Sequence, residues 1–243
     1  MQLSGKVALV TGAGHRLGRA IALALAREGC DLMVHFHRSS EAAEQTAHAI
    51  SGLGVRAVPV QADLTDSEGV HHLFAAVDTA FGGVDLLVNS AAILEQIDLL
   101  DATEDDWQRT VGLSLKGAFF TLQQAAKRMR SRGGGAIVNI SDTAAHRPWQ
   151  RFPLHSVSKA GLEMLTQVAA YRLAPEIRVN AVVPGPTLKP NWMPETRWQQ
   201  ITRETPLRSA VEPDDVASAV IFLMKNDYIT GHIMRVDAGT LLG

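Results

Sequence analysis

The sequence has little cysteine, few aromatic residues and no long hydrophobic run. Cys30 is the only cysteine among its 243 residues, and 5% of the residues are aromatic. An intrachain disulfide is therefore impossible, and a chain so poor in cysteine is typical of a reducing, cytoplasmic compartment. Cys30 itself, at the start of an apolar run, is expected to be a buried small hydrophobe.

Segments that would direct the chain to a membrane or out of the cell are not found either. No apolar run approaches the roughly 20 residues that a membrane-spanning helix needs. The first residues lead directly from a polar stretch into Val7–Val10. They lack the charged, apolar and small-residue regions of a signal peptide. We therefore expect a cytoplasmic protein with no membrane partner.

Neither sign of charge dominates the composition. The chain has 23 Lys and Arg against 25 Asp and Glu, a formal net charge of −2. Without a basic field, electrostatic binding to nucleic acid or to an anionic membrane is disfavoured. The 46% of hydrophobic residues are typical of a compact protein with a large core. A small-molecule substrate is the expected partner, and residues 1–243 are expected to form one domain.

Short aliphatic runs alternate with longer amphipathic segments along the whole chain. This alternation predicts βαβ units and an α/β fold, a Rossmann-type, doubly wound, seven-stranded parallel sheet with helices on both faces. The expected strands are Val7–Thr11, Leu32–His37, Ala57–Gln61, Leu86–Asn89, Ala136–Ile140, Arg178–Val183 and Ile233–Val236. The expected helices are Leu17–Glu28, Ser40–Gly52, Ser67–Phe81, Glu104–Arg130, His155–Leu173 and Pro213–Met224.

The segment 185–211 differs in amino-acid composition from the rest of the chain. It is rich in proline and contains Trp192, Met193 and Trp198, so an irregular insertion is expected. Ligands of parallel sheets bind outside the carboxyl ends of the strands, and this segment follows the sixth strand. It is therefore expected to cover a substrate, the alternative being a packing or interface loop.

A glycine-rich turn joins the first expected strand to the first expected helix. Gly12 permits a tight turn, Gly14 lets the backbone approach a phosphate, and Gly18 lets the helix pack closely on the strand. The helix N-terminus beside this turn favours an anion. The position of the turn, more than its glycine content, predicts a pyrophosphate site.

The end of the second strand indicates which dinucleotide binds. An NAD-preferring site would have an acidic residue here for the ribose hydroxyls. This sequence has His37, Arg38 and Ser39 instead, with Arg16 in the glycine turn as a further cation. These donors suit a 2′-phosphate, so NADP(H) is the expected cofactor. The alternative is a solvated basic loop end.

Several short motifs follow one another in order. They are Thr11-Gly12-x-x-x-Arg16-x-Gly18, Asp63, Asn89-Ser90-Ala91-Ala92, His155-x-x-x-Lys159, Val179–Gly185 and Thr230–Gly239. In their order and spacing the chain resembles the short-chain dehydrogenase/reductase family over essentially its whole length. The resemblance implies a nicotinamide-dependent oxidoreductase. It also implies a homotetramer or homodimer built in part on the helices Glu104–Arg130 and His155–Leu173.

Within this family, the chain is most similar to the pteridine reductase branch. Arg16 stands where a glycine is usual, and the segment His35–Ser39 and Asp142 fit the same branch. The implied substrate is a pteridine, reduced at a C=N bond. The stretch Ala92-Ile93-Leu94 lacks the aromatic residue of that branch, so Trp149, Trp192 or Trp198 would have to supply the second flat face.

The family resemblance also implies a set of cofactor-binding residues. Asp63 would hold the adenine ring, and Pro184, Gly185 and Thr187 would line the carboxamide pocket. No metal is expected. The full implied set is Gly12, Gly14, Arg16, Leu17, Gly18, His37, Arg38, Ser39, Asp63, Leu64, Asn89, Ser90, Ala91, Lys159, Pro184, Gly185 and Thr187.

The catalytic tetrad of the family, Asn, Ser, Tyr and Lys, is only partly present. Its positions fall on Ser114, Asp142, His155 and Lys159. An imidazolium, with a reference pKa of about 6.5 against about 10 for a phenol, is the stronger acid. Asp142 would favour the charged imidazole and Lys159 would oppose it. Ser114 would take whatever part of the Asn role a hydroxyl can reach.

Three roles of His155 stay open. It is a general acid or substrate donor, a filler in a site that uses Asp142 and water, or the mark of an inactive enzyme. Asp142 can also be an ordinary turn-forming residue. The leading hypothesis is an NADPH-dependent reductase of a C=O or C=N bond. The alternative is a catalytically silent NADP(H)-binding protein that acts as a sensor.

Overall fold

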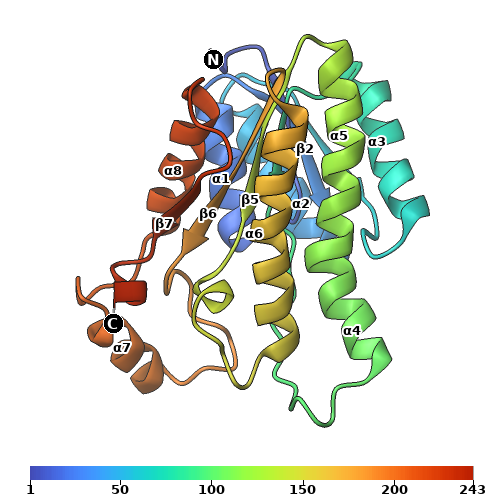
Figure 1. The fold of residues 1–243 in the computed structure, drawn as a ribbon. Coiled ribbons are helices and arrows are strands. Elements are labelled where there is room, and N and C mark those ends of the chain that lie inside the picture. The colour runs from blue at the N-terminus through green and yellow to red at the C-terminus, as the bar shows by residue number, and fades with distance from the viewer. Residues whose placement is uncertain (243) are drawn as a thin grey trace.

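The computed structural model describes residues 1–242, so residue 243 of the expected domain lies outside the described residues. Its sheet has seven parallel strands in the order β3-β2-β1-β4-β5-β6-β7. The predicted Rossmann-type architecture is confirmed (Figure 1). The strands are β1 (Val7–Val10), β2 (Asp31–Phe36), β3 (Ala57–Gln61), β4 (Leu86–Asn89), β5 (Gly135–Ile140), β6 (Ile177–Pro184) and β7 (Ile233–Val236).

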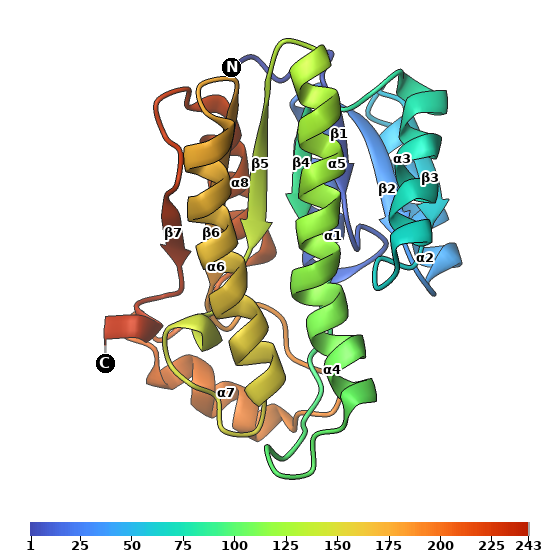
Figure 2. The same ribbon diagram turned by 45° about the vertical axis from the view of Figure 1, so that its right-hand side comes forward.

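Helices cover both faces of the sheet. Leu9 and Val10 are adjacent in β1 but belong to the cores on opposite faces, as alternation along a buried strand requires. One core packs α1, α2 and α8 against the sheet and the other packs α3, α5 and α6 (Figure 2). The helices are α1 (Arg16–Arg27), α2 (Ser40–Ser51), α3 (Ser67–Phe81), α4 (Glu104–Val111), α5 (Ala118–Ser131), α6 (Pro153–Leu173), α7 (Glu195–Glu204) and α8 (Pro213–Lys225). None of these helices, within residues 1–242, is both long and apolar enough to cross a bilayer.

The strand order places the ligand-binding crevice. The chain winds outward from β1 to β3 in one direction and from β4 to β7 in the other. The loops after β1 and β4 therefore diverge and leave a crevice at the carboxyl edge of the sheet. Thr11 bridges this point, since its hydroxyl accepts hydrogen bonds from the amides of Ser90 (3.0 Å) and Ala91 (3.1 Å).

The prediction of one helix over Glu104–Arg130 is wrong in its middle. The helix is interrupted by a π-helical turn, Gly112–Gly117, which separates α4 from α5. Glycine at both ends of the turn lowers the α-helical propensity there. The apolar periodicity continues through the turn, so the sequence pattern does not reveal the wider winding.

The prediction of an irregular segment over 185–211 also needs correction, because it contains α7. This helix starts after Pro194 with Glu195 in its first turn, which suits the positive end of the helix dipole. Its residues are all partly or fully exposed, so the helix has no buried apolar stripe for a periodicity search to find. The other predicted elements match the structure to within two residues at each end.

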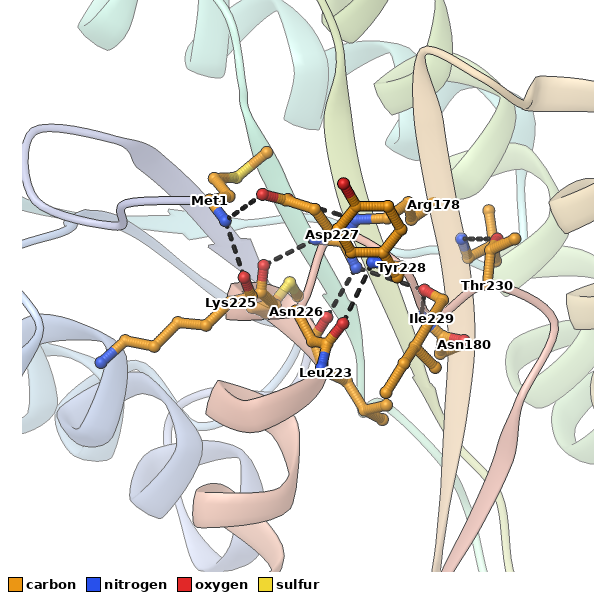
Figure 3. A network of polar contacts seen from close by, with 12 residues as sticks. Met1, Arg178, Asn180, Leu223, Lys225, Asn226, Asp227, Tyr228, Ile229 and Thr230 are labelled. Carbon is orange, nitrogen blue, oxygen red and sulfur yellow. Dashed lines mark hydrogen bonds and ion pairs between the residues drawn. The ribbon is translucent and has the colours of Figure 1, made fainter.

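A polar network at the start of β6 explains part of the Val179–Gly185 motif (Figure 3). The buried Arg178 guanidinium donates to the carbonyls of Leu223 (2.7 Å) and Met224 (2.6 Å), which are at the C-terminus of α8. Asn180 donates to the carbonyl of Ile229 (2.9 Å). The Met1 amine donates to the carbonyl of Lys225 (2.7 Å). The network satisfies carbonyls that the helix leaves open and ties α8 to the sheet.

Candidate active site

A cavity of about 1260 Å³ opens at the carboxyl ends of the strands. Most of the residues that the sequence proposes for cofactor or catalysis lie in its wall, although they come from every third of the chain. They are Gly12, Arg16, Leu17, Gly18, His37, Arg38, Ser39, Asp63, Leu64, Ser90, Ala91, Asp142, His155, Lys159, Pro184, Gly185 and Thr187. Gly14, Asn89 and Ser114 lie behind the described wall.

The glycine turn after β1 has a geometry that other residues would disturb. Gly12 has φ +69°, and a Cβ there would lie 3.1 Å from the Ala91 Cα. A Cβ on Gly18 would lie 2.2 Å from the Gly12 carbonyl oxygen, so α1 packs directly on the turn. His15, which precedes α1, makes no side-chain cap. The first amides of α1 are therefore available to an anion, and the turn fits a pyrophosphate.

His35 holds this turn, and the sequence did not single it out as a site residue. Its Nδ1 accepts a hydrogen bond from the Gly12 amide (3.1 Å), so its Nε2 carries the proton and donates to the Ala62 carbonyl (3.1 Å). Burial lowers the pKa of His35 to about 4, which keeps the ring neutral. The signal in the sequence is a lone polar residue within the apolar strand β2.

The end of β2 presents the predicted phosphate-binding residues. His37, Arg38 and Ser39 all line the cavity. The His37 Nε2 lies 3.7 Å from Asp63 Oδ2. Burial raises the pKa of Asp63, but hydrogen bonds from the Thr65 amide and hydroxyl outweigh this and leave it below its ordinary value. Asp63 is therefore an acceptor beside a cluster of donors.

Arg16 lines the cavity, and its role toward a 2′-phosphate stays a prediction. Its guanidinium donates to the carbonyls of Leu188 (2.8 Å) and Lys189 (3.3 Å) in the segment 185–211. Its backbone has φ +53°, the left-handed region that favours glycine. Arg16 thus links the glycine turn to the far wall of the cavity.

Asn89 and Ser114 are buried and do not belong to the described cavity wall. The Asn89 amide donates to Asn139 Oδ1 (2.9 Å) and accepts from the Thr121 hydroxyl (2.7 Å), so it ties β4 to β5 and α5. Ser114 lies in the π-helical turn, and its hydroxyl has no hydrogen-bond partner among the described residues. Ser114 is not part of the described cavity wall, and its catalytic role stays a prediction. Gly14 packs behind the turn, where its carbonyl accepts from Thr46 (3.1 Å).

Lys159 is a buried cation at the centre of the site. Its Nζ donates to the carbonyl of Ile140, the last residue of β5, over 2.6 Å. Burial lowers its pKa to about 8, although the carboxylates of Asp142 and Glu163 act in the opposite direction. The ammonium form is therefore the main form at neutral pH.

His155 lies one turn before Lys159 on α6 and is buried. Its Nδ1 is 3.2 Å from the Ile93 carbonyl, which can only accept, so Nδ1 carries a proton. Its Nε2 is 3.5 Å from Asp142 Oδ2 but makes no hydrogen bond with any described residue. Nε2 and the Asp142 carboxylate are thus within ion-pair distance but not hydrogen-bonded. Nε2 is the ring nitrogen without a partner among the described residues.

Asp142 forms a turn, as the sequence allowed, and its catalytic role stays a prediction. Its Oδ1 accepts from the amide of Ala144 (2.8 Å) and so caps the short 3-10 turn Thr143–Ala145. Its Oδ2 faces His155. The turn-forming function fixes one oxygen and leaves the other directed at the imidazole.

Aromatic rings supply a flat wall near His155. Trp149 stacks on His155 with ring centroids 6.2 Å apart and an interplanar angle of 27°. Phe152 contacts Trp149 at 5.7 Å and Trp192, in the segment 185–211, at 6.0 Å. Trp198 also lines the cavity. The cavity wall therefore contains aromatic rings, although the stretch Ala92-Ile93-Leu94 after β4 has none.

A parallel sheet with a glycine turn at its crevice and a buried lysine beside it defines the class of nicotinamide-dependent, Rossmann-type oxidoreductases. A family model described as Enoyl-(Acyl carrier protein) reductase matches residues 12–240. A short-chain type dehydrogenase/reductase of Picea abies is 33% identical, over 98% of this chain and 93% of its own. The chain therefore belongs to the short-chain dehydrogenase/reductase family, as its motifs predict.

Two further relatives differ in their cofactors and substrates. An L-rhamnose 1-dehydrogenase (NAD(P)(+)) of Azotobacter vinelandii is 37% identical, over 98% of each chain. The crystal structure of FolM Alternative dihydrofolate reductase 1 from Brucella canis, complexed with NADP, is 30% identical. It superposes with a TM-score of 0.94 over 100% of this chain and 96% of its own. Membership of the family therefore gives a nicotinamide cofactor and leaves the substrate open.

Proposed function

We propose that the protein is an NADPH-dependent reductase of a C=O or C=N bond in a small polar substrate, with pteridines as the leading substrate class. The observation that carries this proposal is the juxtaposition of Asp142, His155 and Lys159 at the cavity wall. It supplies a proton-bearing group and a buried cation at the place where the cofactor motifs converge. When bound, NADPH supplies the hydride.

The preference for NADPH rests on the end of β2. His37, Arg38 and Ser39 offer donors to a 2′-phosphate, and no acidic residue follows β2 directly to bind the 2′-hydroxyl instead. Asp63, Leu64, Ser90 and Ala91 would line the adenosine side, and Lys159 would hold the nicotinamide ribose. At the other end, Pro184, Gly185 and Thr187 would line the carboxamide pocket.

The proton would be delivered by His155. Because Nδ1 donates to the Ile93 carbonyl, only Nε2 can give a proton to a substrate. The carboxylate of Asp142 lies 3.5 Å from Nε2, the position from which the proton would be given. Asp142 would also orient the substrate.

A flat, polar substrate suits the wall formed by Trp149, Phe152 and Trp192. The segment 185–211 carries Trp192 and α7 into the cavity lining, and its role is to cover the substrate. The similarity to FolM Alternative dihydrofolate reductase 1 supports a pteridine substrate, because a folate contains a pteridine ring.

The activity test is NADPH oxidation measured against dihydropterins, diketones, quinones and cyclic imines between pH 5 and pH 8. Turnover of a dihydropterin that is lost in His155→Gln would support the complete proposal. Turnover restricted to another carbonyl would retain the reductase and remove the pteridine. Tight NADPH binding with no turnover, together with activity gained in His155→Tyr, would replace the reductase with a silent NADP(H)-binding protein. The departures from the family tetrad at Ser114, Asp142 and His155 are the observation in favour of that second candidate.

Replacing Arg38 with Ala is expected to weaken NADPH binding about 10- to 100-fold, the effect of losing a hydrogen bond to a charged group. NADH binding should change little, because NADH has no 2′-phosphate. Nicotinamide fluorescence titration measures both dissociation constants. Arg27→Ala, at the far end of α1, is the control. An equal loss for NADH and NADPH would contradict the assignment of Arg38.

The proposed homotetramer or homodimer would use the outer faces of α5 and α6. Phe119, Val157, Met164 and Val168 are each between 44% and 59% exposed there, and a groove of about 300 Å³ runs between the two helices. Apolar side chains in such a continuous patch favour burial against another subunit.

The double variant Met164→Glu, Val168→Glu is expected to be monomeric at micromolar concentration by light scattering, while the wild type is a dimer or tetramer. Leu53→Glu, an exposed leucine elsewhere, should leave the assembly intact. A monomeric wild type would refute the assembly.

A further inference from the structure

Glu163 carries a largely buried carboxylate that the reaction proposed above does not use. It lies on α6 one turn after Lys159, and its side chain is 12% exposed. Its Oε1 accepts a hydrogen bond from the Ser141 hydroxyl (2.6 Å). The His146 Nε2 lies 3.0 Å from Oε2 and 3.1 Å from Oε1. A carboxylate held on two sides in this way has a fixed position.

The two partners of Glu163 bracket the turn that carries Asp142. Ser141 follows β5 directly, and its amide donates to the Val182 carbonyl of β6 (2.8 Å). His146 follows the 3-10 turn Thr143–Ala145 that Asp142 caps. Glu163 therefore fastens both ends of the segment 141–146 to α6, the helix that holds His155. The 3.5 Å separation between Asp142 and His155 depends on this attachment, because those residues come from the two elements that Glu163 joins.

Glu163 also acts on Lys159 through its charge. The charged groups that act on Lys159 are Asp142, from the turn after β5, and Glu163, on its own helix; both favour the ammonium form against the effect of burial. His155 faces Asp142, and His146 faces Glu163. Removing the Glu163 charge leaves Asp142 as the remaining carboxylate that supports the buried cation.

We infer that Glu163 is a positioning residue of this site: it fixes the Asp142-bearing turn to α6 and places a second negative charge beside Lys159. The inference rests on the proposed function for its relevance to catalysis. The structural part stands without it, because the contacts involve this chain alone. Glu163 does not line the cavity itself and contacts its wall through Ser141, so its effect on the site passes through the turn with Asp142 and through Lys159.

The test compares two substitutions of Glu163 by NMR in the protein without cofactor. Glu163→Gln keeps an acceptor for Ser141 and loses the charge, whereas Glu163→Ala loses both. In Glu163→Gln the titration of the Lys159 side chain should move to lower pH. In Glu163→Ala the amide resonances of residues 141–146 should change as well, since the turn also loses its attachment. Glu176→Gln, an exposed acid at the other end of the sheet, is the matched control.

Ser141→Ala separates geometry from charge. It removes one hydrogen bond and keeps the carboxylate, so the Lys159 titration should match that of the wild type. An unchanged Lys159 titration in Glu163→Gln would overturn the inference, as would a shift in Ser141→Ala as large as that in Glu163→Gln. Should Glu163→Ala fail to fold, Glu163→Gln still decides the matter. Absence of NADPH turnover in the wild type would count against the proposed function and leave these titrations to be judged separately.

Discussion

Lys159→Ala is expected to abolish NADPH-dependent turnover, with a loss in kcat/KM of at least about a hundredfold, the scale of a lost catalytic proton-transfer group. The buried ammonium is fixed by the Ile140 carbonyl at the edge of the cavity, where a nicotinamide ribose would lie. Its pKa of about 8 adds a pH dependence. NADPH affinity should be highest below pH 8, where Nζ is charged, and should decrease as pH rises through 8. Steady-state kinetics and fluorescence titration from pH 6 to pH 9.5 measure both effects.

The control for this experiment is Lys6→Ala, which changes a lysine before β1 at the opposite edge of the sheet. It should leave both the rate and the pH dependence unchanged. Retention of wild-type turnover in Lys159→Ala would contradict the catalytic assignment. A pH-independent NADPH affinity in the wild type would contradict the placement of Lys159 beside the cofactor.

His155→Gln is expected to lower kcat about a hundredfold, because glutamine cannot donate a proton as an acid does. NADPH binding should be little affected, since His155 faces Asp142 and Trp149. Asp142→Asn should also lower kcat, because the carboxylate beside Nε2 is then lost. Stopped-flow measurement of NADPH oxidation follows these steps directly.

His48→Gln, on the exposed side of α2, is the matched control and should behave as the wild type. If His155→Gln retains activity, then the proton comes from Asp142 or from water, and His155 has a structural role. Loss or retention of activity in His155→Gln thus decides which group donates the proton at a site where, of the tetrad, only the lysine matches the family pattern.

The fold was largely predictable because the strands of a doubly wound sheet are buried on both faces. Short apolar runs such as Val7–Val10 and Leu86-Leu87-Val88 are typical of such buried strands. The π-helical turn at Gly112–Gly117 and the helix α7 were not predictable. The first shares its apolar pattern with an α-helix, and the second has no buried face to produce a pattern.

The site was predictable where a motif fixes backbone geometry and less so where side chains meet across the fold. Gly12 is required by the close approach of Ala91, which follows β4, and Gly18 by its contact with the turn itself. The contacts of His35, Trp149 and Glu163 depend on which elements pack together, and no local pattern of the sequence predicts them. Ser114 shows the converse, because a position matched by spacing lies buried in a π-helical turn and outside the described cavity wall.

The buried ammonium of Lys159 also affects the proton balance of folding. Its pKa in the folded chain is about 8, below the 10.5 of an unperturbed lysine. Below pH 8 the folded and unfolded chains both hold this proton, and burial of the charge lowers the free energy of unfolding by its full amount. Between pH 8 and 10.5 the unfolded chain binds more protons, so the contribution of this residue to stability rises with pH. Lys159, which the proposed reaction needs, therefore lowers the stability of the fold. This effect is larger at neutral pH than above pH 8.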